Sequence, residues 1–169
     1  MSTRRELIQV TAGAVLAAAG EASAQKGGQF FTPEEFRMVD ELSEIIIPAD
    51  EHSPGARAAK VAAYIDARLG ESLEPEPKEL WRVGLKRVDA LAREMHGRSF
   101  LEAGPAERVA VVARMAEHEA DPKTPAELFF REIKARTANA YYTSEIGIHQ
   151  EMEYKGNTIL QEFVRSELK

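Results

Sequence analysis

The motif Thr-Pro-x-Glu occurs twice in this chain, and it limits the fold more than any other sequence feature. The two copies begin at Thr32 and Thr124. In this arrangement Thr caps a helix N-terminus, Pro occupies the first helical position, and Glu returns a hydrogen bond to the capping residue. Apolar residues follow each copy at helical spacing: Phe36, Val39, Leu42 and Ile46 after the first, and Leu128, Phe129, Ile133, Thr137 and Tyr141 after the second. The sequence therefore predicts helices that begin at Pro33 and Pro125.

Three further helices are predicted between these two, over residues 56–69, 78–95 and 105–119, each from an apolar stripe. Pro48 is expected to end the first helix, and the last helix is expected to reach about Tyr142. No segment shows the sustained alternation of β-branched residues that is typical of strands. We therefore predict an all-α fold, a compact bundle of about five helices in residues 25–146, followed by an extended, irregular tail over residues 147–169. Apolar residues such as Met152 and Tyr154 have no helix of their own in this tail, so the tail is expected to contact a partner protein.

The first 24 residues have the pattern of an export signal. Arg4 and Arg5 precede an apolar run at residues 10–19, and Ala22 and Ala24 provide small residues where a signal peptidase needs them. The run is shorter than the roughly 20 apolar residues that span a bilayer, so a permanent anchor is not expected. The stretch "TRRELIQ" resembles the twin-arginine export signal. It predicts cleavage after Ala24 and a periplasmic location, whereas the alternative is an amphipathic N-terminal helix on the protein surface.

Charge and cysteine content exclude several classes of function. The net charge of -6 disfavours binding to nucleic-acid phosphates, so no nucleic-acid partner is expected. The chain has no cysteine, which excludes a thiol nucleophile, a zinc-thiolate site and an iron–sulfur cluster. The G-x-S-x-G, G-x-G-x-x-G and Walker motifs are also missing from the sequence. We therefore predict no catalytic residue, no cofactor-binding residue and no metal ligand in this chain.

Two local clusters leave alternatives open. His118 stands between Glu117 and Glu119, and these side chains could hold a metal ion, which would suit a stand-alone periplasmic helical-bundle enzyme or metal-binding protein. Solvated side chains at the end of a helix are the simpler interpretation. The adjacent Tyr141 and Tyr142 are interpreted either as core packing or as contact with a partner protein.

Three separated segments resemble one known family. They are "TPEEFRMVDELSEIIIPADEHSPGARAAKVAAYIDARL" (32–69), "AYYTSEIG" (140–147) and "EYKGNT" (153–158). Together they resemble the gluconate 2-dehydrogenase subunit 3 family, the small subunits of periplasmic flavoprotein sugar dehydrogenases. The resemblance implies a non-catalytic subunit that stabilises an FAD-binding large subunit of the glucose-methanol-choline type. It also implies that this subunit escorts its partner through the twin-arginine translocation machinery, and that a cytochrome c or another acceptor takes up the electrons.

The resemblance further implies which residues shape or contact the large subunit. The expected interface consists of Tyr141, Tyr142, Thr143, Ser144, Glu145, Ile146, Gly147, Tyr154, Lys155, Gly156, Asn157 and Thr158. An alternative is that residues 154–158 lend side chains to the entrance of the partner's active site. FAD is expected on the partner and no cofactor on this chain. The substrate therefore stays open among gluconate, fructose, glucose and glycosides oxidised at the 3-position, with glucoside 3-dehydrogenase chemistry slightly favoured.

Overall fold

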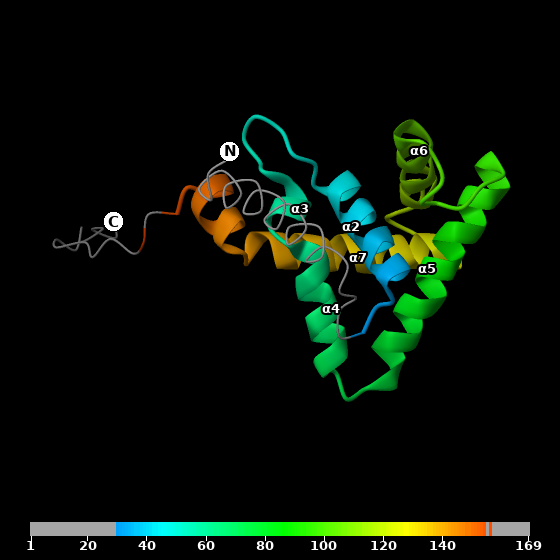
Figure 1. Cartoon of the computed structure of the whole chain (residues 1–169), viewed down its shortest axis with the longest axis horizontal. Helices are drawn as coiled ribbons and strands as arrows, with labels where there is room; N and C mark the ends of the chain where they lie inside the picture. Colours follow the sequence, from blue (N-terminus) through cyan, green and yellow to red (C-terminus); the bar gives the residue numbers. More distant parts are fainter. Residues whose placement is uncertain (1–29, 155, 157–169) are drawn as a thin grey trace, which may run out of the picture.

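Helices account for all regular secondary structure in the described part of the computed structural model, which covers residues 30–154 and 156 (Figure 1). In chain order the elements are α2 (Pro33–Ile46), α3 (Gly55–Ala58), α4 (Val61–Glu71), α5 (Pro75–His96), α6 (Pro105–Ala116), α7 (Pro125–Tyr142) and the π-helix η1 (Gly147–Glu151). The predicted all-α fold is thus confirmed. The predicted signal peptide, with Arg4, Arg5, Ala22 and Ala24, lies outside the described residues. No described helix has the length and apolar character needed to cross a membrane.

Both predicted capping boxes are present. Thr32 Oγ1 accepts a hydrogen bond from the backbone N–H of Glu35 at 3.2 Å, and Glu35 Oε2 accepts one from the N–H of Thr32 at 2.9 Å. The equivalent bonds join Glu127 and Thr124 at 3.3 and 2.8 Å. Each box satisfies two of the backbone N–H groups that a helix N-terminus leaves without intrahelical partners. The two helices therefore begin where the sequence predicts.

Two predicted helix boundaries differ from the structure for local backbone reasons. The helix expected over residues 56–69 is divided into α3 and α4, because Lys60 has a left-handed φ of 56° that interrupts the helical path. The helix expected from residue 78 begins at Pro75. Pro75 and Pro77 lie in the first turn of α5, where a missing N–H costs no intrahelical hydrogen bond. These prolines therefore start the helix instead of separating two elements.

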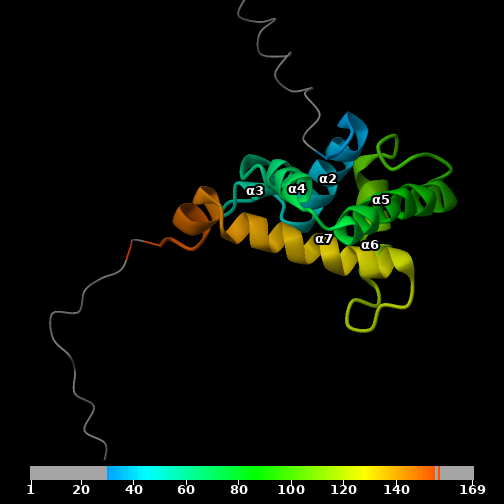
Figure 2. The same cartoon turned by 90° about the horizontal axis from the view of Figure 1, so that it is seen from below.

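α7 is the central helix of the fold. It contacts α2, α4, α5, α6 and η1, and Figure 2 shows it extending along most of the folded part. Its approach to α5 is close, because a Cβ atom added to Gly84 would lie 2.1 Å from the Phe129 ring. The Phe129 ring also packs nearly perpendicular to Trp81, with ring centroids 5.3 Å apart. Trp81 and Phe129 are both fully buried, so this crossing forms the centre of the core.

The residues ahead of α2 are held onto α4 and α5. Asp66 is buried, and its Oδ1 accepts hydrogen bonds from the N–H groups of Phe30 at 3.0 Å and Phe31 at 2.7 Å. Arg82 donates to the carbonyl of Phe30 at 2.7 Å, and its guanidinium lies 4.4 Å from the centroid of the Phe30 ring. Phe31 packs against Trp81. The chain is therefore fixed to the helices from Phe30 onward.

Gly84→Ala is expected to destabilise the protein, although Ala is the better helix former. Without a clash the substitution would stabilise a helix by about 1 kcal/mol. The contact with the Phe129 ring should reverse this gain and cost about 1–3 kcal/mol, because the buried ring has little room to move. Urea unfolding followed by circular dichroism measures the free energy of unfolding.

The control for this measurement is Ala90→Gly, at an exposed position of the same helix. The Ala90→Gly variant should have a free energy of unfolding lower by about 1 kcal/mol, because Gly is a poorer helix former than Ala. A Gly84→Ala variant that is more stable than the unaltered protein would contradict the close crossing of α5 and α7.

Candidate partner-docking surface

The C-terminal end of α7 places its two adjacent tyrosines in different environments. Tyr141 is fully buried, and its hydroxyl lies 2.7 Å from Ser53 Oγ in the loop before α3. Burial raises the pKa of the Tyr141 hydroxyl. Tyr142 is 44% exposed and meets Tyr141 edge to face. Each interpretation of the pair therefore applies to one residue, since Tyr141 packs in the core and Tyr142 lies on the surface.

The segment "TSEIG" after α7 forms a tight turn. Ser144 Oγ donates to the carbonyl of Tyr141 at 2.6 Å and accepts from the N–H of Gly147 at 3.0 Å. A Cβ atom on Gly147 would lie 2.1 Å from the same carbonyl oxygen, so a larger residue does not fit without movement of the backbone. The turn leads into η1, where the extended tail was expected to begin. Residues 147–151 instead form a π-helical turn, because local bonds such as that from Met152 N–H to the Gly147 carbonyl (3.0 Å) satisfy the backbone.

The predicted interface residues do not share one environment. Tyr141 and Gly147 are buried in this chain, where Tyr141 forms a core hydrogen bond and Gly147 forms the turn. Their expected part in the interface therefore stays a prediction, with a role in shaping the surface rather than in direct contact. Ser144 and Ile146 are half-buried. The exposed members are Tyr142, Thr143, Glu145, Tyr154 and Gly156. Lys155, Asn157 and Thr158 lie outside the described residues, and their contact with a partner stays a prediction.

Large apolar side chains are exposed at this end of the molecule. Tyr142 is 44%, Met152 is 51% and Tyr154 is 47% exposed. The neighbouring Glu151 has one carboxylate oxygen that is buried without a hydrogen-bond partner in the described part of the chain. We refer to these four residues as the C-terminal docking surface. Met152 and Glu151 belong to the tail that was expected to contact a partner, although neither was among the interface residues named one by one.

The rival cluster at the end of α6 does not form a metal site. Each side chain of the cluster has a separate partner. Glu117 pairs with Arg114, Glu119 with Lys134 (2.6 Å) and His118 with Glu127 (2.8 Å). The three side chains therefore do not converge on one point. Within residues 30–154 and 156, no group of three or more His, Cys, Asp or Glu side chains has an arrangement that could hold a metal ion.

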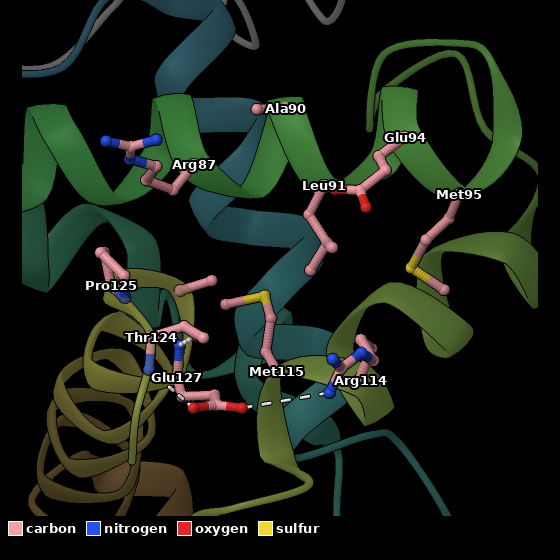
Figure 3. Close-up of a pocket in the computed structure, with 11 residues that line it drawn as sticks. Arg87, Ala90, Leu91, Glu94, Met95, Arg114, Met115, Thr124, Pro125 and Glu127 are labelled. Atoms are coloured by element: carbon pink, nitrogen blue, oxygen red, sulfur yellow. Dashed lines mark hydrogen bonds and ion pairs between the residues drawn. The ribbon is translucent and has the colours of Figure 1, made fainter.

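Glu127 links α6 to the N-terminus of α7. Its carboxylate accepts hydrogen bonds from the backbone N–H groups of Lys123 (2.7 Å) and Thr124 (2.8 Å), and its other oxygen lies 2.8 Å from His118 Nδ1. Figure 3 shows it near Thr124 and Arg114, beside a cavity of about 320 Å³ between α5, α6 and α7. The hydrogen bond with His118, then those with the backbone, lower the pKa of Glu127 to about 2. The ionised carboxylate therefore serves as a helix cap.

Tyr141→Phe and Tyr142→Phe test the two environments at the end of α7. Loss of the Tyr141 hydroxyl removes the buried hydrogen bond with Ser53, so the free energy of unfolding should fall by about 1 kcal/mol. Tyr142→Phe removes a hydroxyl from an exposed side chain and should change the free energy of unfolding by less than about 0.5 kcal/mol. Denaturant unfolding of both variants measures the difference, and equal effects would contradict the buried position of Tyr141.

Acid is expected to remove the stabilisation that Glu127 provides. The pKa of this group is about 2 in the folded protein and 4.5 in an unperturbed carboxyl, so the folded state binds fewer protons than the unfolded state. The contribution is fully present above about pH 4.5 and is lost as the pH falls through about 2. Glu127→Gln should therefore lower the melting temperature near neutral pH. The size of this decrease should shrink as the pH falls from about 4.5 to about 2.

Melting curves of the unaltered protein and of Glu127→Gln between neutral and acid pH give this comparison. Glu79→Gln, at an exposed position of α5, is the matched control for loss of one carboxylate. A melting-temperature difference for Glu127→Gln that stays constant down to about pH 2 would show that the carboxylate does not stabilise the fold through its ionised form.

Comparison with known proteins places this arrangement in a family. The protein-family model described as gluconate 2-dehydrogenase subunit 3 matches residues 33–158, which includes every described helix from α2 to η1. Neither the curated proteins nor the solved structures that were compared give a significant match. The family is named for one subunit of a dehydrogenase complex, so partner subunits are implied. Because the match covers most of the sequence, this chain belongs to the gluconate 2-dehydrogenase subunit 3 family.

Proposed function

We propose that this chain is the non-catalytic small subunit of an exported, FAD-dependent sugar or glycoside dehydrogenase. Its partner is a large flavoprotein subunit of the glucose-methanol-choline type, which holds the FAD and oxidises a CH–OH group of the substrate. The small subunit stabilises the flavoprotein and escorts it, already folded, through twin-arginine export to the periplasm. The electrons then pass from the FAD to a separate acceptor such as a cytochrome c.

The C-terminal docking surface is the observation that carries this proposal. Tyr142, Met152 and Tyr154 lie within the range that matches the family, and each exposes about half of its surface. Full burial of a large apolar side chain contributes about 1.5–3 kcal/mol, and aromatic residues and Met are enriched at protein interfaces. These properties support a binding role for this end of the chain.

The buried polar side chains support a structural role for the rest of the chain. Asp66 and Glu127 bind backbone N–H groups at the starts of two segments. Ser43 Oγ lies 3.2 Å from Thr137 Oγ1 and joins α2 to α7. Each of these groups already has a partner within the scaffold. The proposal therefore assigns the reacting groups and the FAD to the large subunit.

The fixed N-terminal end supports the escort role. A cut after Ala24 leaves the five residues from 25 to 29 ahead of Phe30, which Asp66 and Arg82 hold against the helices. Five residues span at most about 18 Å. Before cleavage, the signal would thus be joined to a folded body by a short connection. This suits a translocation route that accepts folded proteins.

Co-expression tests the proposal in a bacterial host that has twin-arginine export. The large flavoprotein subunit is produced alone, with the unaltered chain, or with a chain carrying Arg4→Lys and Arg5→Lys. Only the unaltered chain should give soluble, FAD-containing and active flavoprotein in the periplasm. The double variant should leave both subunits in the cytoplasm, because its folded part is unchanged and only the export signal is impaired.

Arg37→Lys is the matched control, since it changes an exposed arginine of α2 outside the signal. It should leave export unchanged. Equal solubility, export and activity of the flavoprotein with and without this chain would reject the proposed function. Export of the flavoprotein with the double variant would reject the escort role and leave the stabilising role in place.

A further inference from the structure

A second cavity lies where α4, α5 and α7 meet. Figure 1 shows α4 and α5 converging on their connecting turn in the shape of a V, with α7 crossing between them. The cavity has a volume of about 520 Å³. The lining side chains that matter for its chemistry are Tyr64, Arg68, Ser72, Trp81, Arg136 and Asn139. Most of these carry hydrogen-bond donors, so the cavity differs from an apolar packing defect.

The indole of Trp81 has a polar group that the described fold does not satisfy. Trp81 lines the cavity and is fully buried, yet its Nε1–H has no hydrogen-bond partner within residues 30–154 and 156. The rings of Phe31 and Phe129 pack around it, and an aromatic face is only a weak acceptor. A buried N–H without a strong acceptor is costly, and buried tryptophans usually find one. Because Trp81 is a lining residue, an acceptor placed in the cavity would lie beside its side chain.

The guanidinium groups of Arg68 and Arg136 give the cavity further hydrogen-bond donors besides Trp81 Nε1–H. Arg68 Nη1 lies 3.2 Å from Glu71, and Arg136 Nε lies 2.9 Å from Glu132. Each of these pairs uses one N–H of a guanidinium that has five, and exposed pairs of this kind are weak. Glu71 and Glu74 also line the cavity, so its net charge is close to zero. A carboxylate is nevertheless the group best suited to accept from an indole and two guanidinium groups at once.

Exposed apolar side chains lie at the cavity or next to its lining residues in the sequence. Leu73, at the tip of the turn between α4 and α5, is 99% exposed, and Tyr64 and Leu80 are 44% and 43% exposed. Trp, Tyr and Arg, which all occur in the cavity lining, are the residue types that contribute most to protein binding. Asn139 lines the cavity, and Tyr142 of the C-terminal docking surface is its i+3 neighbour on α7. The cavity and the C-terminal docking surface therefore both include residues near the C-terminal end of α7.

We propose that this cavity receives the carboxylate of an Asp or Glu side chain of the large subunit. The carboxylate accepts hydrogen bonds from Trp81 Nε1–H and from Arg68 and Arg136, while Leu73 contacts apolar surface beside it. This inference rests on the proposed function, because it requires the partner subunit. Solvent does not reach the indole in the free chain, so the side chains over it shift as the carboxylate enters. The Trp81 N–H gains its acceptor only in the complex.

The single tryptophan of the chain allows a direct test. The small subunit is labelled with ¹⁵N and combined with the unlabelled large subunit, so that one indole cross-peak is expected in a ¹H–¹⁵N TROSY spectrum. Trp81→Phe assigns that peak. Complex formation should move it downfield, as a hydrogen bond to a carboxylate does. A purely structural role of Trp81 would leave the peak near its position in the free chain.

Two surface variants measure the contribution of the cavity to affinity without disturbing the core. Leu73→Ser, at an almost fully exposed position, should weaken binding of the large subunit by about tenfold. Arg68→Gln, which keeps most of the side-chain length, should weaken it by a similar factor. The matched control is Val109→Ser, at a half-exposed position of α6 outside the cavity lining, and its affinity should stay within about twofold.

The outcomes separate this inference from the proposed function. One outcome is that the complex forms while the indole peak stays in place and Leu73→Ser binds as tightly as Val109→Ser. That result would overturn the carboxylate site and leave the subunit role intact. Failure of the unaltered chain to bind the large subunit would overturn both.

Discussion

The close approach of α5 and α7 at Gly84 and Phe129 is the constraint on which the rest of the structure depends. Because Gly84 has no side chain, the Phe129 ring lies directly over α5 and packs against Trp81. Trp81 in turn supports Phe31 at the N-terminal end of the described chain. A larger residue at position 84 would separate the two helices and displace α7. The cavity beside Trp81 and the C-terminal docking surface would both change, since each includes residues of α7.

The two ends of α7 are held by different interactions. At its N-terminus, the Glu127 carboxylate caps the helix and binds His118, which fixes α6 to α7. At its C-terminus, the hydroxyl of Tyr141 binds Ser53, and the turn at Gly147 allows no larger residue without a backbone shift. Both ends are therefore held before any partner binds. A surface that is already held in position loses less conformational entropy on association, which favours affinity.

Local interactions are the part of this structure that the sequence predicts well. The capping boxes at Thr32 and Thr124 involve residues three apart, so their pattern is visible without knowledge of the fold. The left-handed Lys60 that divides α3 from α4 has no such local signal. The different burial of Tyr141 and Tyr142 depends on tertiary packing, because adjacent helical positions point about 100° apart and only the fold decides which faces inward. The cavity beside Trp81 likewise depends on three helices meeting.

The resemblance to the family implies that the segment "AYYTSEIG" shapes or contacts the large subunit, and the structure shows how its buried members act on the fold of this chain. Within this segment, Tyr141 forms a core contact, and Ser144 and Gly147 form the turn. These contacts are all with other residues of this chain. They determine where η1 begins and hence where Met152 and Tyr154 are presented. A motif of this kind affects binding indirectly, through the position of the residues that follow it. Changes to its buried members should therefore act on the fold and on the partner contact together, whereas changes to its exposed members act on the contact alone.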